Sequence, residues 1–186
     1  MLTLILLLGF IIVPMGIYQW KERKHSTPAL QWPILAPLIK MDYQPDPPRL
    51  IGKRNGRTVT IDVFRGHVRV ATILPFASRL RVEIAPKAQV LRKAGIVVPD
   101  PVVTNDRAFD DRLMARCSDM QAGLNIIDPV LRQRLLAHPI VDIFGHGQMV
   151  QWQVPAVRDP DHIEDLLDVL TVLATEMERF PETSNA

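Results

Sequence analysis

The side chains that could do chemistry are few and lie far apart along the chain. The single cysteine, Cys117, alternates with Leu113 and Ala115 in a strand-like pattern, and a free cysteine in such a position is commonly buried as a small apolar residue. A nucleophilic cysteine needs a lowered pKa and a nearby base, and the surrounding sequence supplies neither. We therefore expect Cys117 to be structural.

The histidines do not form a recognisable metal site. No two of them are four residues apart, and no cysteine accompanies them at zinc-finger spacing. His146 lies between two glycines, a pattern that is typical of an exposed hairpin tip. The sequence predicts no metal site and no cofactor, and the histidines in question are His25, His67, His138, His146 and His162.

Acidic residues gather in two places. DPDHIED, residues 159–165, has four acids around His162 but lacks the alternate ligands and the sixth-position glycine of a calcium loop, and the start of a helix accounts for the acids. Asp106, Asp110 and Asp111 could pair for acid–base chemistry, although carboxylates near a loop are usually solvated. Phosphate-binding loops, nucleophile elbows and dinucleotide fingerprints are absent from the sequence. We therefore expect a non-enzyme, and the sequence identifies no small-molecule substrate.

The first twenty residues indicate where in the cell the protein is located. No side chain from Leu2 to Trp20 is charged, and a helix of this length spans roughly 28 Å, close to the hydrocarbon core of a bilayer. A signal peptide would carry basic residues before the apolar run and a small-residue cleavage site after it, and here the order is reversed. The sequence predicts a transmembrane anchor at residues 1–20, with a cleaved signal peptide and a core helix as the alternatives.

The charges after this run predict its orientation. Basic residues that flank a span stay on the cytoplasmic side, and Lys21, Arg23 and Lys24 follow the run directly. We expect a single-pass protein of the bacterial inner (cytoplasmic) membrane, with its N-terminus outside and its C-terminal domain in the cytoplasm. A lone cysteine agrees, because exported domains of this size more often carry disulfide pairs.

The rest of the chain is long enough for one domain. It consists of a basic half followed by an acidic half. Residues 21–100 hold 15 Lys and Arg against 6 Asp and Glu, a net charge of +9, whereas residues 101–186 hold 7 against 14, a net charge of −7. Either the two halves fold together, or the basic half contacts anionic lipid. Nucleic acid is not expected, because the possible basic surface has no interleaved aromatic residues; it consists of Arg49, Lys53, Arg54 and Arg57.

Residues 21–48 are predicted to form a strap that is first basic and then rich in proline and apolar residues. Six prolines within residues 26–48 argue against a continuous helix or a central strand. The strap is too apolar for a solvated tether, so we expect it to press against the bilayer, its own domain or a neighbouring membrane protein. The residues expected to contact membrane or partner are Leu6, Phe10, Tyr18, Trp20, Lys21, Arg23, Lys24, Trp32, Ile34, Leu35 and Leu38.

The body, residues 49–180, begins with period-two alternation. FDDRLMARCS (109–118) is predicted as a later strand, and IVDIF and QMVQWQV are predicted to flank GHG (145–147) as a hairpin. An antiparallel meander of about four strands is predicted from RLIGK (49–53), RTVTIDVF (57–64), HVRVATIL (67–74) and RLRVEIAP (79–86).

Helical patterns occupy much of the remaining sequence. One helix is expected from Asp119 towards Ile127, and Asp128 before Pro129 begins another. The last is the clearest, because apolar residues from Ile163 onwards recur at three- and four-residue spacing, before a polar tail at 181–186. The predicted fold is α+β: a single N-terminal transmembrane helix, then a mainly antiparallel sheet with helices packed on one face.

Several different short motifs follow one another along the body. GKRNGR (52–57) is followed by an F-D-x-x-[FL] strand at FDDRL, a D-P-x-[LV]-R-x-x-L-L helix at DPVLRQRLL, a hairpin and a closing helix. This order resembles an uncharacterised bacterial family of membrane-associated domains over about residues 49–180, although Leu113 stands where the family usually has an aromatic residue. The resemblance implies the fold, and the family brings no known activity.

These observations lead to three functional hypotheses. The first is a non-catalytic accessory or structural subunit that anchors in the membrane and braces the cytoplasmic face of a larger integral membrane protein complex. The second is a membrane-tethered binding or sensing module for anionic lipid or a soluble ligand. The third is an unrecognised membrane-tethered enzyme, which would need a deep pocket at Asp110, Asp111 or His146. The expected partners are therefore the lipid bilayer and integral membrane protein subunits.

Overall fold

The computed structural model describes residues 29–90 and 99–182. The transmembrane helix predicted at 1–20 lies outside these ranges. Within them, no helix is both long enough and apolar enough to cross a membrane.

The centre of the fold is a seven-stranded sheet in which every pair of neighbouring strands is antiparallel. The strand order is β1-β2-β3-β4-β6-β5, and β7 pairs with β4. The prediction of an α+β fold with a mainly antiparallel sheet is confirmed. The strands are β1 (Asp42–Pro45), β2 (Pro48–Arg54), β3 (Arg57–Phe64), β4 (His67–Pro86), β5 (Pro101–Val102), β6 (Leu113–Cys117) and β7 (Ile143–Val154).

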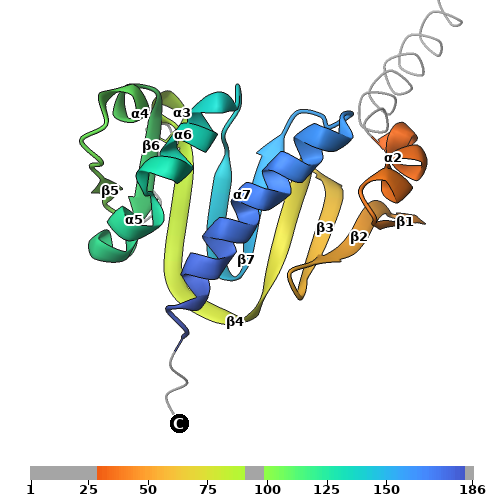
Figure 1. Cartoon of the computed structure of the whole chain (residues 1–186), viewed down its shortest axis with the longest axis horizontal. Coiled ribbons are helices and arrows are strands. Elements are labelled where there is room, and N and C mark those ends of the chain that lie inside the picture. Colours follow the sequence, from red (N-terminus) through yellow and green to blue (C-terminus); the bar gives the residue numbers. More distant parts are fainter. Residues whose placement is uncertain (1–28, 91–98, 183–186) are drawn as a thin grey trace, which may run out of the picture.

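The longest helix, α7, runs diagonally across the sheet (Figure 1). Its first turn is capped by Asp159, whose side chain accepts a hydrogen bond from the Asp161 N–H, and the predicted closing helix is confirmed. The helices are η1 (Ala29–Gln31), α2 (Trp32–Leu38), α3 (Lys87–Val90), α4 (Arg107–Arg112), α5 (Met120–Ile126), α6 (Pro129–Ala137) and α7 (Pro160–Glu178).

A bend shared by β4 and β7 replaces two predicted turns. The stretches predicted as separate strands at 67–74 and 79–86 are one strand of 20 residues, and β7 pairs along both of its limbs, with register shifts between Ile73 and Arg81. The predicted GHG hairpin is therefore wrong, because its residues continue β7. Figure 1 shows the two strands turning together, so that each limb of β4 gains a different outer neighbour, β3 or β6.

The strand predicted at 109–118 is correct only in its second half. Asp106 accepts a hydrogen bond from the Phe109 N–H and so caps α4, which ends where β6 begins at Leu113. Phe109 turns inward and is fully buried. An aspartate cap three residues before an apolar residue favours this helical turn over extended backbone.

The hydrophobic core lies between α7 and the sheet. On the strands it follows the alternation predicted from sequence, with Val59 and Ile61 of β3 buried. Cross-strand pairs continue it through Val70 of β4 and Trp152 of β7. The face that the period-two pattern marked as apolar is therefore the face that α7 covers.

The polypeptide before β2 is part of this body. Pro33 lies in the first turn of α2, where its missing N–H costs nothing, and β1 pairs with β2 from Asp42 to Pro45. Trp32, Leu35 and Ile39 are buried in the core cluster. The folded body thus includes residues 29–48, which the sequence pattern assigned to a strap.

Candidate contact surface

The outer face of η1 and α2 carries the two most exposed large apolar side chains of the described residues. Leu30, Ile34 and Leu38 follow one another at intervals of four residues and are 72%, 71% and 62% exposed. Pro33 and Pro37 lie exposed beside them, and Gln31 is the polar side chain among them. We call Leu30, Ile34 and Leu38 the α2 face.

The structure divides the predicted contact residues of the strap into two groups. Trp32 and Leu35 are buried in the core, so the contact with membrane or partner that the sequence suggested for them is wrong. Ile34 and Leu38 remain available on the α2 face. The other residues of that prediction lie outside the described chain, and they are Leu6, Phe10, Tyr18, Trp20, Lys21, Arg23 and Lys24.

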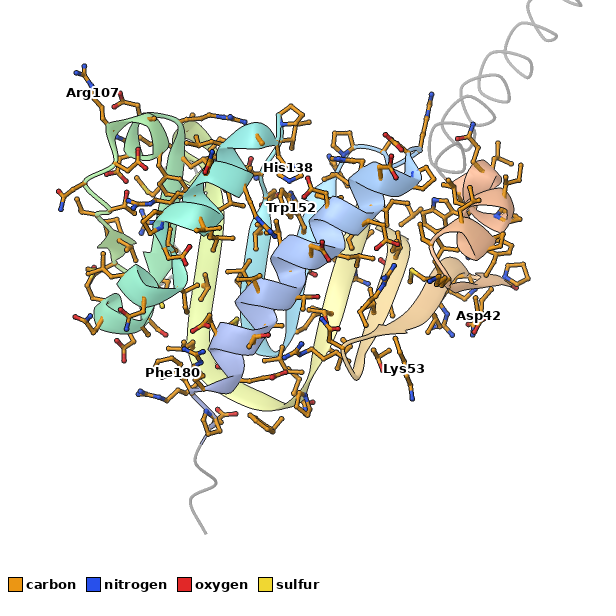
Figure 2. All side chains as sticks on the ribbon, viewed as in Figure 1. Asp42, Lys53, Arg107, His138, Trp152 and Phe180 are labelled. Carbon is orange, nitrogen blue, oxygen red and sulfur yellow. The ribbon has the colours of Figure 1, made fainter. Side chains whose placement is uncertain are left out.

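The α2 face lies at one end of the molecule. Figure 1 shows α2 beside β1 and β2 at one end of the longest axis, while α4, α5 and β5 form the other end. In Figure 2, Asp42 marks the first end and Arg107 the second. A contact made through α2 would therefore leave the α4–α5 end far from that contact.

The predicted basic surface does not exist as one patch, because the strand period divides its members. Arg54 and Arg57 lie on the α7 side of the β2–β3 hairpin, and Arg54 forms an ion pair with Glu164 of α7. Arg49 and Lys53 alternate to the other side. Arg49 donates a 2.6 Å hydrogen bond to Gln44 and Lys53 is exposed (Figure 2).

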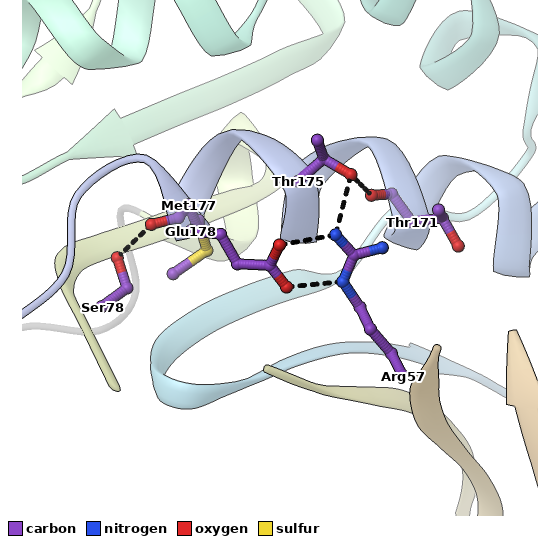
Figure 3. Close-up of polar contacts among 6 residues, drawn as sticks. All are labelled: Arg57, Ser78, Thr171, Thr175, Met177 and Glu178. Atoms are coloured by element: carbon purple, nitrogen blue, oxygen red, sulfur yellow. Dashed lines mark hydrogen bonds and ion pairs between the residues drawn. The ribbon is translucent and has the colours of Figure 1, made fainter. Parts of the chain in front are cut away.

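The contact with the most hydrogen bonds joins β3 to the end of α7 (Figure 3). The Arg57 guanidinium donates two hydrogen bonds of 2.6 Å to Glu178 and one of 3.1 Å to the Thr175 hydroxyl. Nearby, the Ser78 hydroxyl at the bend of β4 donates to the Met177 carbonyl at 2.8 Å. Basic and acidic halves of the chain thus fold together and meet through these pairs.

The residues with possible catalytic chemistry are dispersed. Burial raises the pKa of the Cys117 thiol, which opposes thiolate formation. Asp110 accepts a 3.0 Å hydrogen bond from Thr104, and Asp111 pairs with Arg107 across an exposed turn. His146 is exposed on β7. Among residues 29–90 and 99–182, no three His, Cys, Asp or Glu side chains gather closely enough to hold a metal ion.

The described cavities are small. One of about 220 Å³ includes Asp110, whose neighbours in it are Lys87, Val103 and apolar residues of β5 and β6. Another of about 290 Å³ lies between the β2–β3 turn and α7, beside the Arg57–Glu178 pair. In both, each charged side chain has either a partner within the fold or an exposed position.

Sequence reasoning missed the environment of His138. This side chain is only 4% exposed and meets the edge of Trp152, with ring centroids 4.7 Å apart (Figure 2). Its Nε2 atom lies 3.1 Å from an Asp165 oxygen without the alignment of a hydrogen bond. The His162 ring is 5.6 Å away, and Arg112 donates to the His138 carbonyl. In the sequence, the proline that follows His138 indicated only that a helix ends there.

We expect acid to weaken the fold through His138. Burial lowers its pKa, and the positive charge of Arg112 and the nearby His162 act in the same direction against Asp165. The unfolded chain therefore binds this proton first as pH falls below about 6.5. The contribution of neutral His138 to the free energy of unfolding is fully present above that pH. It is lost as the pH falls through the lower pKa of the native state, and the loss is about 1.4 kcal/mol for each unit by which the native and unfolded pKa values differ.

The measurement is the free energy of unfolding of the detergent-solubilised chain between pH 7.5 and 4.5. His138→Gln should flatten this profile relative to the unaltered chain. His67→Gln, at an exposed histidine, provides the matched control and should leave the profile unchanged. Equal acid slopes in all three proteins would show that His138 is not responsible.

Comparisons with known proteins bear on the fold. No protein-family model and no curated protein matches the chain, which agrees with the resemblance to an uncharacterised family. Among solved structures, the chain is similar to the crystal structure of the mycobacterial trehalose monomycolate transport factor A, with a TM-score of 0.63 and 10% sequence identity. The match covers 88% of this chain and 99% of the other. At this identity the likeness establishes a shared fold.

Proposed function

We propose that this chain is a non-catalytic accessory subunit of a membrane transport assembly. The observation that carries the proposal is the likeness over 88% of the chain to a protein whose name describes it as a transport factor. The apolar run at 1–20 supports the same reading, because it is long enough to hold the chain at a membrane. The α2 face adds an exposed apolar surface soon after that run.

In this proposal the run at 1–20 is a single-pass anchor in the bacterial inner membrane. The basic residues that follow it place the body in the cytoplasm. There the body braces the cytoplasmic face of an integral membrane protein without doing chemistry itself. The pairing of Arg54 and Arg57 with α7 favours this role over anionic-lipid binding by the basic cluster, because both guanidinium groups already have carboxylate partners.

Affinity purification in a mild detergent tests the proposal. The full chain, tagged after Ala186, should retain an integral membrane transport protein in constant ratio through a second, size-based separation, and mass spectrometry would identify it. A chain that runs alone, with no membrane protein at constant ratio, would contradict the accessory role.

A matched bait shows which part recognises the partner. In it, residues 1–20 are exchanged for an unrelated single-pass helix of equal length, and the body is left intact. If the body makes the principal contact, this bait retains the same membrane protein. Retention by the original bait alone would mean that helix packing within the bilayer supplies the specificity.

A further inference from the structure

We propose that the α2 face lies in the interfacial region of the lipid bilayer, so that this domain makes a second membrane contact besides the predicted anchor. The inference rests on the membrane location in the proposed function and adds the occupant of this surface. Its residues, Leu30, Ile34 and Leu38, present aliphatic side chains to the outside along one side of a short helical segment.

The chemistry of the face favours lipid over protein. Protein interfaces concentrate their binding energy in aromatic and arginine side chains and carry polar groups for directional bonds. The α2 face has aliphatic residues flanked by Pro33 and Pro37, with Gln31 as its polar neighbour. Burial of apolar side chains among lipid acyl chains is non-directional and requires only apolar surface area.

The sequence on both sides fits the same position. Leu30 lies ten positions after Trp20, and ten residues of fully extended chain span no more than about 35 Å. The α2 face is therefore held within reach of any bilayer that contains residues 1–20. Positive charges lie at both ends of the apolar stretch, at Lys21, Arg23 and Lys24 before it and at Lys40 after it, where anionic headgroups would attract them.

The opposite side of α2 makes this a rigid contact. Trp32, Leu35 and Ile39 are buried in the core, and the Ile39 N–H caps the helix by donating to the Leu35 carbonyl. The direction of the α2 face is thus fixed relative to the sheet. With this end in the bilayer interface, the α4–α5 end of the longest axis points away from the membrane (Figure 1).

Depth-dependent fluorescence quenching tests the proposal in the full-length chain. Ile34→Cys in a Cys117→Ala background is labelled with an environment-sensitive fluorophore and reconstituted in nanodiscs with one-quarter anionic lipid. Lipid brominated near the headgroup end of its acyl chains should reduce the emission about twofold, because interfacial helices place their apolar face about 5–10 Å into this region. Ile34 is largely exposed, so the label does not disturb the core.

Two further label positions make the result decisive. Val130→Cys, also exposed but on α6, should be unaffected by brominated lipid and open to aqueous iodide. Phe10→Cys, near the middle of the predicted span, reports whether the predicted anchor is embedded, through quenching by lipid brominated near the ends of its acyl chains. Quenching at positions 10 and 34 but not 130 supports the proposal.

The remaining outcomes overturn it in distinguishable ways. Quenching at position 10 alone, with position 34 open to iodide, places the α2 face in water and leaves the accessory role standing. Protection of position 34 only after the co-purified membrane protein is added assigns the face to a protein partner. Quenching at neither position removes both this inference and the membrane location beneath the proposed function. Quenching as proposed, without any co-purifying protein, removes the accessory role alone.

Discussion

Trp32→Ala is expected to lower the free energy of unfolding by about 3–5 kcal/mol, the range for truncating a buried aromatic side chain. Trp32 has no exposed area and is among the largest fully buried side chains of the described chain. Its loss would leave a cavity where α2 meets the core, beside Leu35 and Ile39. Urea unfolding of the detergent-solubilised chain, followed by circular dichroism, measures the change.

The same helix supplies the control. Ile34→Ala removes a side chain that is 71% exposed, and substitutions at such positions usually change stability by less than about 0.5 kcal/mol. Two large apolar residues only two positions apart should therefore differ several-fold in their effect on stability. An equal and small effect of both substitutions would mean that residues 29–41 are a detachable strap, and the assignment of α2 to the body would fail.

The contrast between Trp32 and Ile34 also shows what the sequence could not predict. Both are apolar and lie among prolines, so composition indicated a segment that presses against something. Which residue turns inward depends on the helical phase, and α2 is too short for its own periodicity to reveal that phase. Proline at the first turn was compatible with a helix from the start, and the packing of Trp32 against the core decides the matter.

The strands show the complementary case. Alternation along RTVTIDVF marked Val59 and Ile61 as inward-facing, and they are buried. The same rule, applied from Arg49 to Arg57, also divides the basic cluster between two faces of the hairpin, although the sequence was interpreted as one patch. The partners Glu164 and Glu178 lie more than a hundred residues further along the chain, so only the tertiary fold could identify them.

The turns were the least predictable part. Gly66 after Arg65 marks a real hairpin, with positive φ at both residues. Gly145 and Gly147 give the same local signal, and Gly147 does have a φ of 58°, yet β7 passes through both. The reason is long-range pairing: β4 bends, and β7 remains bonded to it on either side of the bend. Glycine with a positive φ is favoured both in a hairpin turn and in a β-bulge, so the local sequence does not distinguish the two.

Gly145→Val should accordingly cost about 1–3 kcal/mol of unfolding free energy, the usual range for overpacking a core. A Cβ atom at Gly145 would lie 2.6 Å from the Met177 sulfur and 3.2 Å from its methyl carbon. Met177 belongs to α7 and is fully buried, so it has little room to move. At an exposed hairpin tip the same substitution would meet no neighbouring helix.

A double-mutant cycle isolates this steric cause. Met177→Ala alone should destabilise by about 2–5 kcal/mol through the cavity that it leaves. In that background the valine at position 145 has space, so its additional cost should be at least about 1 kcal/mol smaller than in the unaltered chain. Thermal or urea unfolding of the four proteins measures the coupling. Additive effects would show that Met177 of α7 does not pack against Gly145. They would contradict the close approach of α7 to the bend of β4 and β7.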